Sequence, residues 1–146
     1  MATVTRDLDC PPAAVLAVLA DGWSYAVWVV GTSRIRAVDP EWPAPGTRIA
    51  HSVGLWPMLL DDVTVVRRWA PDRGIDLQAR AWPAGEARVQ IEVRPRAGGG
   101  CTVELREDAV RGPGTVIPKP IRTALLVPRN VETLRRLGFL AEGRRT

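Results

Sequence analysis

The feature that most constrains the fold is a run of short alternating segments between residues 32 and 106, followed by one long stretch with helical periodicity. Alternation of apolar and polar residues with a period of two is typical of strands with one buried face. Residues 87–94 show it most clearly. There we expect Ala87, Val89, Ile91 and Val93 to be buried and Arg88, Gln90 and Glu92 to be exposed.

Turn residues separate these segments. Glycine and proline occur at 70–74, at 83–85 and at 98–100, and strands joined by such tight turns must be antiparallel. The strands expected besides 87–94 cover residues 2–9, 32–37, 49–55, 59–69, 75–81 and 101–106. The sequence therefore predicts an antiparallel sheet of about seven strands.

Helices are expected on both sides of this run. Pro11 and Pro12 begin a helix after the first strand, since proline is tolerated in a first helical turn, and residues 23–30 form a second short helix or turn. A long helix begins near Pro120, and Pro128 should kink or break it. Its expected apolar face comprises Ile121, Ala124, Leu125, Val131, Leu134, Leu137 and Ala141. This helix is the element large enough to cover the sheet, which makes the fold class α+β.

Length and composition indicate a single domain over residues 1–146. The chain is 46% hydrophobic and 25% charged, which excludes general disorder. No apolar run approaches the roughly 20 residues that span a bilayer, and the first residues lack the apolar core of a signal peptide. We therefore expect a soluble, cytoplasmic protein without a membrane span.

The charge does not indicate a nucleic-acid binder. The net charge is +4 and the isoelectric point is about 10.0, but arginines are spread from Arg6 to Arg145 and interleaved with acids, whereas nucleic-acid binders cluster their cations. Binding to nucleic acid or to a protein through the basic surface remains a remote alternative.

Metal and cofactor motifs are not found. Cys10 and Cys101 match no metal-ligand spacing, and His51 is the only histidine, so a Cys/His zinc site is nearly excluded. The sequence contains no Gly-rich phosphate loop and no nucleophile elbow. We expect no metal and no cofactor, and we expect both thiols to be reduced in the cytoplasm.

Several short motifs resemble the START-like SRPBCC superfamily, which includes polyketide cyclases and dehydrases. The motifs, in chain order, are Asp9-Cys10-Pro11-Pro12, Asp21-Gly22 with Tyr25, Trp28-Val29-Val30-Gly31-Thr32, Trp42-Pro43-x-Pro45-Gly46-Thr47, Glu107 before Gly112-Pro113, and Arg129-Asn130 with Leu134 and Leu137. They span nearly the whole chain, and their order makes the resemblance fairly specific.

The resemblance implies a helix-grip fold, in which a strongly curved antiparallel sheet wraps around the terminal helix and encloses a cavity. It also implies that Cys10 and Cys101 lie close together, because the first and last strands are neighbours; we expect no disulfide between them. The implied partner is a small hydrophobic or aromatic molecule, lipid- or polyketide-like. The alternative is a cyclase, aromatase or dehydratase acting on a polyketide-like substrate. A homodimer is compatible with the sequence.

Two polar residues share the parity of the apolar strand faces and are the candidates for catalysis. His51 alternates with Ile49 and Val53 and is either a proton-exchanging group in the cavity or a hydrogen-bonded core histidine. Glu107 continues the parity of Leu105. It is either an acid or ligand anchor in the cavity or a strand-end glutamate paired with an arginine of the terminal helix.

The expected ligand-binding residues are mostly aromatic. Tryptophans are abundant, and their indole N–H groups can orient a ligand in an apolar pocket. Arg67 or Arg68 must face inward if strand 59–69 is regular, and an inward arginine can bind an anionic oxygen. The expected set is Trp28, Trp56, Trp69, Arg67 and Leu125.

Overall fold

The structure is a computed structural model that describes residues 2–53, 60–81 and 85–143. The strands are β1 (Ala2–Leu8), β2 (Thr32–Val38), β3 (Arg48–Val53), β4 (Leu60–Ala70), β5 (Gly74–Ala81), β6 (Gly85–Pro95) and β7 (Cys101–Arg111). The helices are α1 (Pro12–Leu19), α2 (Tyr25–Trp28) and α3 (Lys119–Gly143), with short 3₁₀ turns η1 (Gly22–Ser24) and η2 (Pro113–Val116). The element order expected from the sequence is confirmed.

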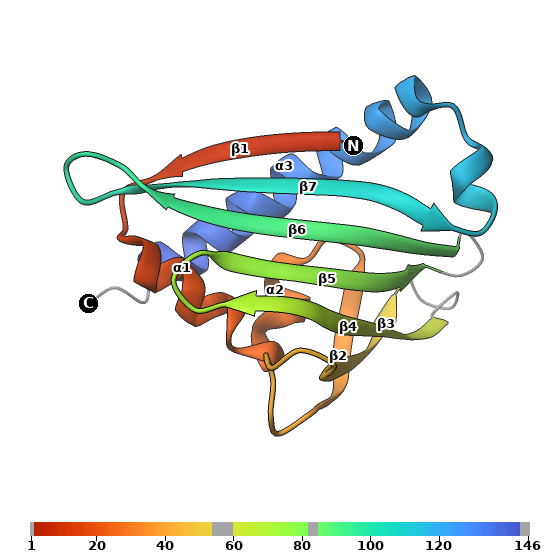
Figure 1. Cartoon of the computed structure of the whole chain (residues 1–146), viewed down its shortest axis with the longest axis horizontal. Coiled ribbons are helices and arrows are strands. Elements are labelled where there is room, and N and C mark those ends of the chain that lie inside the picture. The colour runs from red at the N-terminus through yellow and green to blue at the C-terminus, as the bar shows by residue number, and fades with distance from the viewer. Residues whose placement is uncertain (1, 54–59, 82–84, 144–146) are drawn as a thin grey trace.

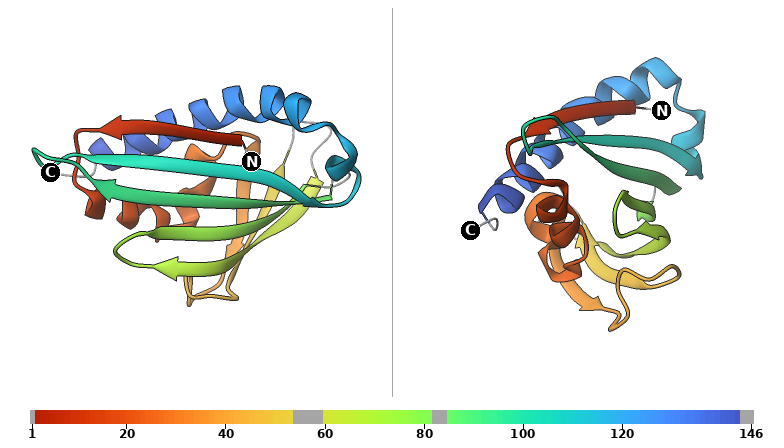
Figure 2. Two further views of the ribbon diagram at one scale, coloured as in Figure 1. Left: turned by 45° about the horizontal axis from the view of Figure 1, so that its top comes forward. Right: turned by 60° about the vertical axis from the view of Figure 1, so that its left-hand side comes forward.

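One sheet contains all seven strands, in the order β1-β7-β6-β5-β4-β3-β2. Every neighbouring pair is antiparallel, and β1 lies beside β7 with Leu8 opposite Cys101. The sheet curls into a trough, and the helices lie on its open side (Figures 1 and 2). The α3 helix packs against β1, β7, α1 and α2. The antiparallel sheet with a covering helix is the one that the sequence predicts, and its curvature is the one that the resemblance implies.

The parity expected for β6 is confirmed, although burial is graded along the strand. Ile91 and Val93 are buried in the core. Ala87 and Val89 face the same side but are only half-buried, because they line hollow space rather than packed core.

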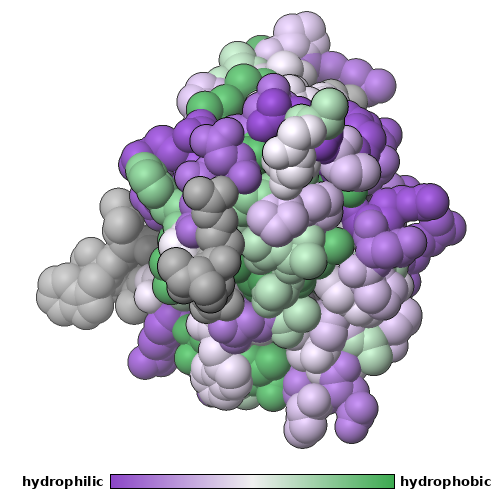
Figure 3. All heavy atoms as spheres, turned by 90° about the vertical axis from the view of Figure 1, so that its left-hand side faces the viewer, coloured by the Kyte–Doolittle hydropathy of each residue, from purple (hydrophilic) through white to green (hydrophobic). Residues whose placement is uncertain are grey.

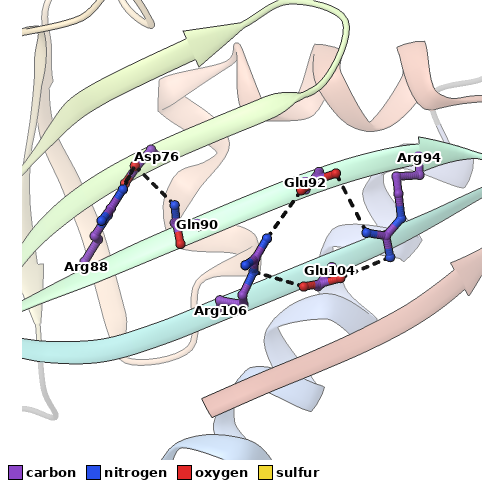
Figure 4. Close-up of polar contacts among 7 residues, drawn as sticks. All are labelled: Asp76, Arg88, Gln90, Glu92, Arg94, Glu104 and Arg106. Atoms are coloured by element: carbon purple, nitrogen blue, oxygen red, sulfur yellow. Dashed lines mark hydrogen bonds and ion pairs between the residues drawn. The ribbon is translucent and has the colours of Figure 1, made fainter. Parts of the chain in front are cut away.

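The outward-facing side of β5, β6 and β7 carries paired charges. Figure 4 shows ion pairs running across these strands, from Arg106 to Glu92 and Glu104 and from Arg94 to the same two glutamates. The ion pairs cover Glu92, and Gln90 contacts Asp76 of β5, which explains why these two residues are half-buried rather than exposed.

The α3 helix differs from expectation in two ways. It continues through Pro128, so a break there is wrong. Its buried face comprises Asn130, Thr133, Leu134, Leu137, Gly138 and Ala141. The expected residues Ile121, Ala124, Leu125 and Val131 are exposed instead. Ile121 and Leu125 belong to the turns before Pro128, which overlie a cavity described below and cannot bury their apolar residues as the later turns bury Leu134 and Leu137.

The two cysteines meet where β1 leads into α1. Cys10 and Cys101 are both free thiols and fully buried. Burial, together with the neighbouring Cys10, raises the pKa of the Cys101 thiol to about 11. Their proximity agrees with the implication drawn from the resemblance.

Candidate functional site

A cavity of about 420 Å³ lies between the sheet and the first half of α3. Its apolar lining includes Val29, Val30, Ala79, Ala87, Ala109, Ile117, Leu125 and Leu126. Its polar lining includes Tyr25, His51, Thr64, Arg80, Glu86, Glu107, Arg122 and Arg129. The walls therefore come from α2, from strands β3 to β7 and from α3, and no local stretch of sequence forms the site alone.

A chain of three hydrogen-bonding side chains lies on one wall. His51 Nε2 is 2.8 Å from Thr64 Oγ1, and the same oxygen is 3.4 Å from the hydroxyl of Tyr25. All three residues are buried. Because β3 and β4 are antiparallel neighbours, His51 and Thr64 project from adjacent strands, while Tyr25 approaches from α2.

The hydrogen bonds that link Tyr25, Thr64 and His51 can run in either direction. The Thr64 hydroxyl has one proton, so it donates either to His51 Nε2 or to the Tyr25 oxygen and accepts from the other. Among the described residues, His51 Nδ1 has no hydrogen-bond partner. Either tautomer of His51 is thus compatible with the surroundings.

Burial sets the protonation states of His51 and Tyr25. Desolvation lowers the pKa of His51 below its ordinary 6.5, so the imidazole is neutral at pH 7. Desolvation also raises the pKa of Tyr25, although the hydrogen bond from Thr64 partly opposes it. The wall consequently presents neutral hydrogen-bonding groups rather than charges.

A buried carboxylate lies on another wall. Glu107 accepts from Arg129 Nη1 at both oxygens, at 3.1 and 3.2 Å. Arg129 also donates from Nε to the Val30 carbonyl, at 3.1 Å. The arginine therefore joins β7, α3 and the segment after α2. The sequence left two interpretations open for Glu107, and the structure shows the one in which it pairs with an arginine of the terminal helix. The same carboxylate also lines the cavity.

A second arginine of α3 lies seven residues before the first. Arg122 donates from Nη1 to Asp108, at 2.7 Å, and its buried Nε has no hydrogen-bond partner within the described part of the chain. Residues seven apart lie on the same side of a helix, so Arg122 and Arg129 both line the cavity.

A smaller chamber of about 40 Å³ adjoins the cavity. Both are lined by Tyr25, Val29, Ala79, Glu107 and Arg129. Beyond these residues the chamber is lined by Trp28, Asn130 and Thr133, with Leu77, Val89, Ile91 and Leu105. We call it the inner chamber. Two of these lining residues carry a buried donor, Trp28 Nε1 and Asn130 Nδ2, that has no hydrogen-bond partner among the described residues.

The candidate residues from the sequence are placed as follows. His51 and Glu107 line the cavity, and their nearest polar partners are Thr64 and Arg129 rather than each other. Leu125 lines the cavity although it is 64% exposed. Trp28 lies in the inner chamber. Trp56 lies outside the described residues.

Arg67 and Trp69 are placed away from the cavity. Arg67 is exposed and donates to Gln78, because alternation from the buried Thr64 and Val66 places it on the outward face of β4. The β4–β5 pairing shifts its register between Val66 and Arg68, and Arg68 is exposed as well. Trp69 lines a groove between α1 and the β4–β5 turn. Figure 3 shows hydrophobic side chains on that end of the molecule among hydrophilic ones.

Several site residues were not found from the sequence, among them Tyr25, Thr64, Arg122, Arg129, Asn130 and Thr133. Tyr25 is the only tyrosine in the chain, and that rarity within an apolar segment is a usable signal. Thr64 shares the parity of Val66, which is buried. Arg129 and Asn130 were assigned no role, because the pattern of α3 does not show which polar residues meet the sheet.

The described residues contain neither a metal-binding cluster nor a membrane-spanning helix. Within residues 2–53, 60–81 and 85–143, no group of three or more His, Cys, Asp or Glu is arranged to hold a metal ion. No helix in the same ranges is long and apolar enough to cross a membrane.

Comparison with known proteins agrees with this architecture. The family model described as "Polyketide cyclase / dehydrase and lipid transport" matches residues 1–138. Comparison with curated proteins gives no match.

Solved structures share the fold at low sequence identity. Ara h 8.0201 superimposes with a TM-score of 0.71 at 12% identity, over 97% of both chains. A conserved protein from Geobacillus kaustophilus has a TM-score of 0.75 at 10% identity, over 99% of this chain and 96% of that one. DynU16, a putative protein in the dynemicin biosynthetic locus, has a TM-score of 0.68 at 17% identity, over 96% of this chain and 46% of that one.

Proposed function

Since this chain belongs to the polyketide cyclase / dehydrase and lipid transport family, we propose that it binds a small hydrophobic or aromatic molecule in the cavity between the sheet and α3. The observation that carries the proposal is the cavity itself, about 420 Å³ and lined by aliphatic side chains with a few polar groups. Ligand sites in proteins typically enclose roughly 300–1,000 Å³ and have this kind of lining.

The polar groups of the cavity favour binding over turnover. A general acid or base must reach the reacting atom of the substrate. Here Arg129 holds both oxygens of Glu107, and Thr64 holds Nε2 of His51, so the carboxylate and one ring nitrogen are already engaged within the protein. Such groups can orient a ligand without reacting with it.

A second candidate function is a cyclase, aromatase or dehydratase acting on a polyketide-like substrate. The hydrogen-bonded side chains of Tyr25, Thr64 and His51 favour it, because a proton can be passed along linked hydroxyl and imidazole groups. His51 and Glu107 would be the residues that carry such a reaction. It requires both to reach one substrate, whereas binding requires only the enclosed space.

The experiment is a titration of the protein with phenylnaphthylamine, a neutral probe that fluoresces in apolar surroundings. We expect saturable binding of one probe per chain. Ala109→Phe places a ring in the cavity and should weaken binding at least about tenfold. The matched control is Ala37→Phe, on the exposed side of β2, which should bind as the parent does.

Two results would contradict the proposal: no saturable binding, or equal affinity in Ala109→Phe when that variant is folded. A small molecule that copurifies and is identified by mass spectrometry would supply the natural ligand class. Conversion of that molecule by the purified protein would establish the enzyme instead.

A further inference from the structure

Two residues that line the inner chamber carry buried hydrogen-bond donors that the described part of the protein does not satisfy. Trp28 is 3% exposed and Asn130 is 2% exposed, and neither Trp28 Nε1 nor Asn130 Nδ2 has a partner among the described residues. Leaving a buried donor unsatisfied costs free energy. Two such donors beside one small chamber indicate that the chamber receives an acceptor atom.

The donor chemistry decides what that atom can be. An indole N–H only donates, so Trp28 requires an acceptor. Thr133 also lines the chamber, and its oxygen already accepts from the Val30 amide at 3.3 Å, which leaves its hydroxyl proton free to donate. The chamber holds about 40 Å³, which is close to the volume of one water molecule or one oxygen substituent.

The charges around the chamber exclude an anion. Glu107 lines both the chamber and the main cavity, and Arg129 is already bonded to Glu107 and to Val30. A ligand carboxylate would meet the buried carboxylate of Glu107 with no free cation assigned to it. A neutral carbonyl oxygen accepts from Trp28 and Asn130 without this repulsion.

We infer that the inner chamber is the polar end of the ligand site and that it receives a neutral carbonyl oxygen, as in a ketone, an aldehyde or an amide, from an otherwise apolar ligand. This inference rests on the proposed function, since the body of the ligand lies in the main cavity. The two spaces share five lining residues, so one molecule can occupy both. An apolar end there would displace water without replacing its hydrogen bonds, which disfavours a hydrocarbon.

The test uses three naphthalene probes that differ only at one end: the propionyl ketone prodan, dimethylaminonaphthalene without the propionyl group, and the matching naphthoate. We expect the parent protein to bind prodan more tightly than either of the others. The carbonyl stretching frequency of isotope-labelled prodan should fall on binding, because hydrogen bonds to the oxygen weaken the C=O bond.

Variants connect this preference to the chamber. Trp28→Phe removes the N–H and keeps an aromatic ring, and Asn130→Leu removes the amide donors at similar volume. Each should lower the prodan affinity about five- to tenfold, leave dimethylaminonaphthalene within about twofold, and raise the carbonyl frequency. The matched control is Trp23→Phe at a tryptophan that is 61% exposed, which should change none of these values.

Every other result contradicts either the inference about the chamber or the proposed function. If both folded variants weaken prodan and dimethylaminonaphthalene equally, with an unchanged carbonyl frequency, the chamber holds only water and the inference is wrong. If the naphthoate binds as tightly as prodan, the inference that the chamber receives a neutral carbonyl oxygen is wrong. If dimethylaminonaphthalene binds but prodan does not, the cavity is a binding site and the chamber assignment alone fails. If no probe binds, the proposed function fails as well.

Discussion

Arg129 on α3 donates hydrogen bonds from Nη1 to both carboxylate oxygens of Glu107 on β7, at 3.1 and 3.2 Å. The glutamate side chain is 8% exposed and the arginine side chain 37%. The pair therefore ties the covering helix to the sheet at the wall that the cavity shares with the inner chamber.

Arg129→Met should destabilise the protein by about 1–3 kcal/mol, because it leaves the buried Glu107 carboxylate without its cation. The free energy of unfolding in urea measures this. Arg135→Met is the control on the same helix, since the Arg135–Glu132 pair is exposed and exposed pairs contribute little. Equal losses in the two variants would show that the buried pair adds nothing.

His51 should make stability depend on pH. Burial lowers its pKa in the folded protein below the ordinary 6.5. Between the two values the unfolded chain binds a proton that the folded chain does not, so the free energy of unfolding falls as the pH drops through 6.5 and levels off below the folded pKa. Because the chain has one histidine, His51→Gln should remove this part of the dependence. Urea unfolding between about pH 7.5 and 5.5 compares the two proteins; superimposed profiles would refute the assignment.

The two thiols should react only when the protein opens. Cys10 and Cys101 are fully buried, and the pKa of Cys101 is about 11, so little thiolate forms at pH 8. A thiol-disulfide reagent should therefore titrate two thiols in denatured protein and react slowly with native protein. Rapid native labelling, or fewer than two thiols in unreduced denatured protein, would contradict this prediction.

Arg88 should matter more than its exposed position suggests. It donates to Asp76 through Nε and Nη2, the latter at 2.6 Å, and Asp76 is 5% exposed (Figure 4). Arg88→Met leaves that carboxylate with the longer Gln90 contact of 3.4 Å, so we expect a loss of about 1–3 kcal/mol in the free energy of unfolding. Arg94→Met, whose glutamate partners are more exposed, should lose clearly less.

The sequence by itself determined the strands, their antiparallel order of pairing along the chain, and the side to which most residues point. The inward direction of His51 and Glu107 follows from alternation with their immediate neighbours, because the period of two is a property of the extended backbone. The first helix follows just as locally from Pro11 and Pro12.

Only the tertiary structure decided which residues meet at the site. The register of β4 against β5 shifts after Val66 and leaves Arg68 exposed, and Trp69 lies beside α1 instead of in the cavity. Tyr25, Thr64 and His51 come from α2, β4 and β3, and Arg129 reaches Glu107 across 22 positions of sequence. Such contacts depend on the curvature of the whole sheet and on how α3 crosses it, and neither is encoded in the alternation of neighbouring residues.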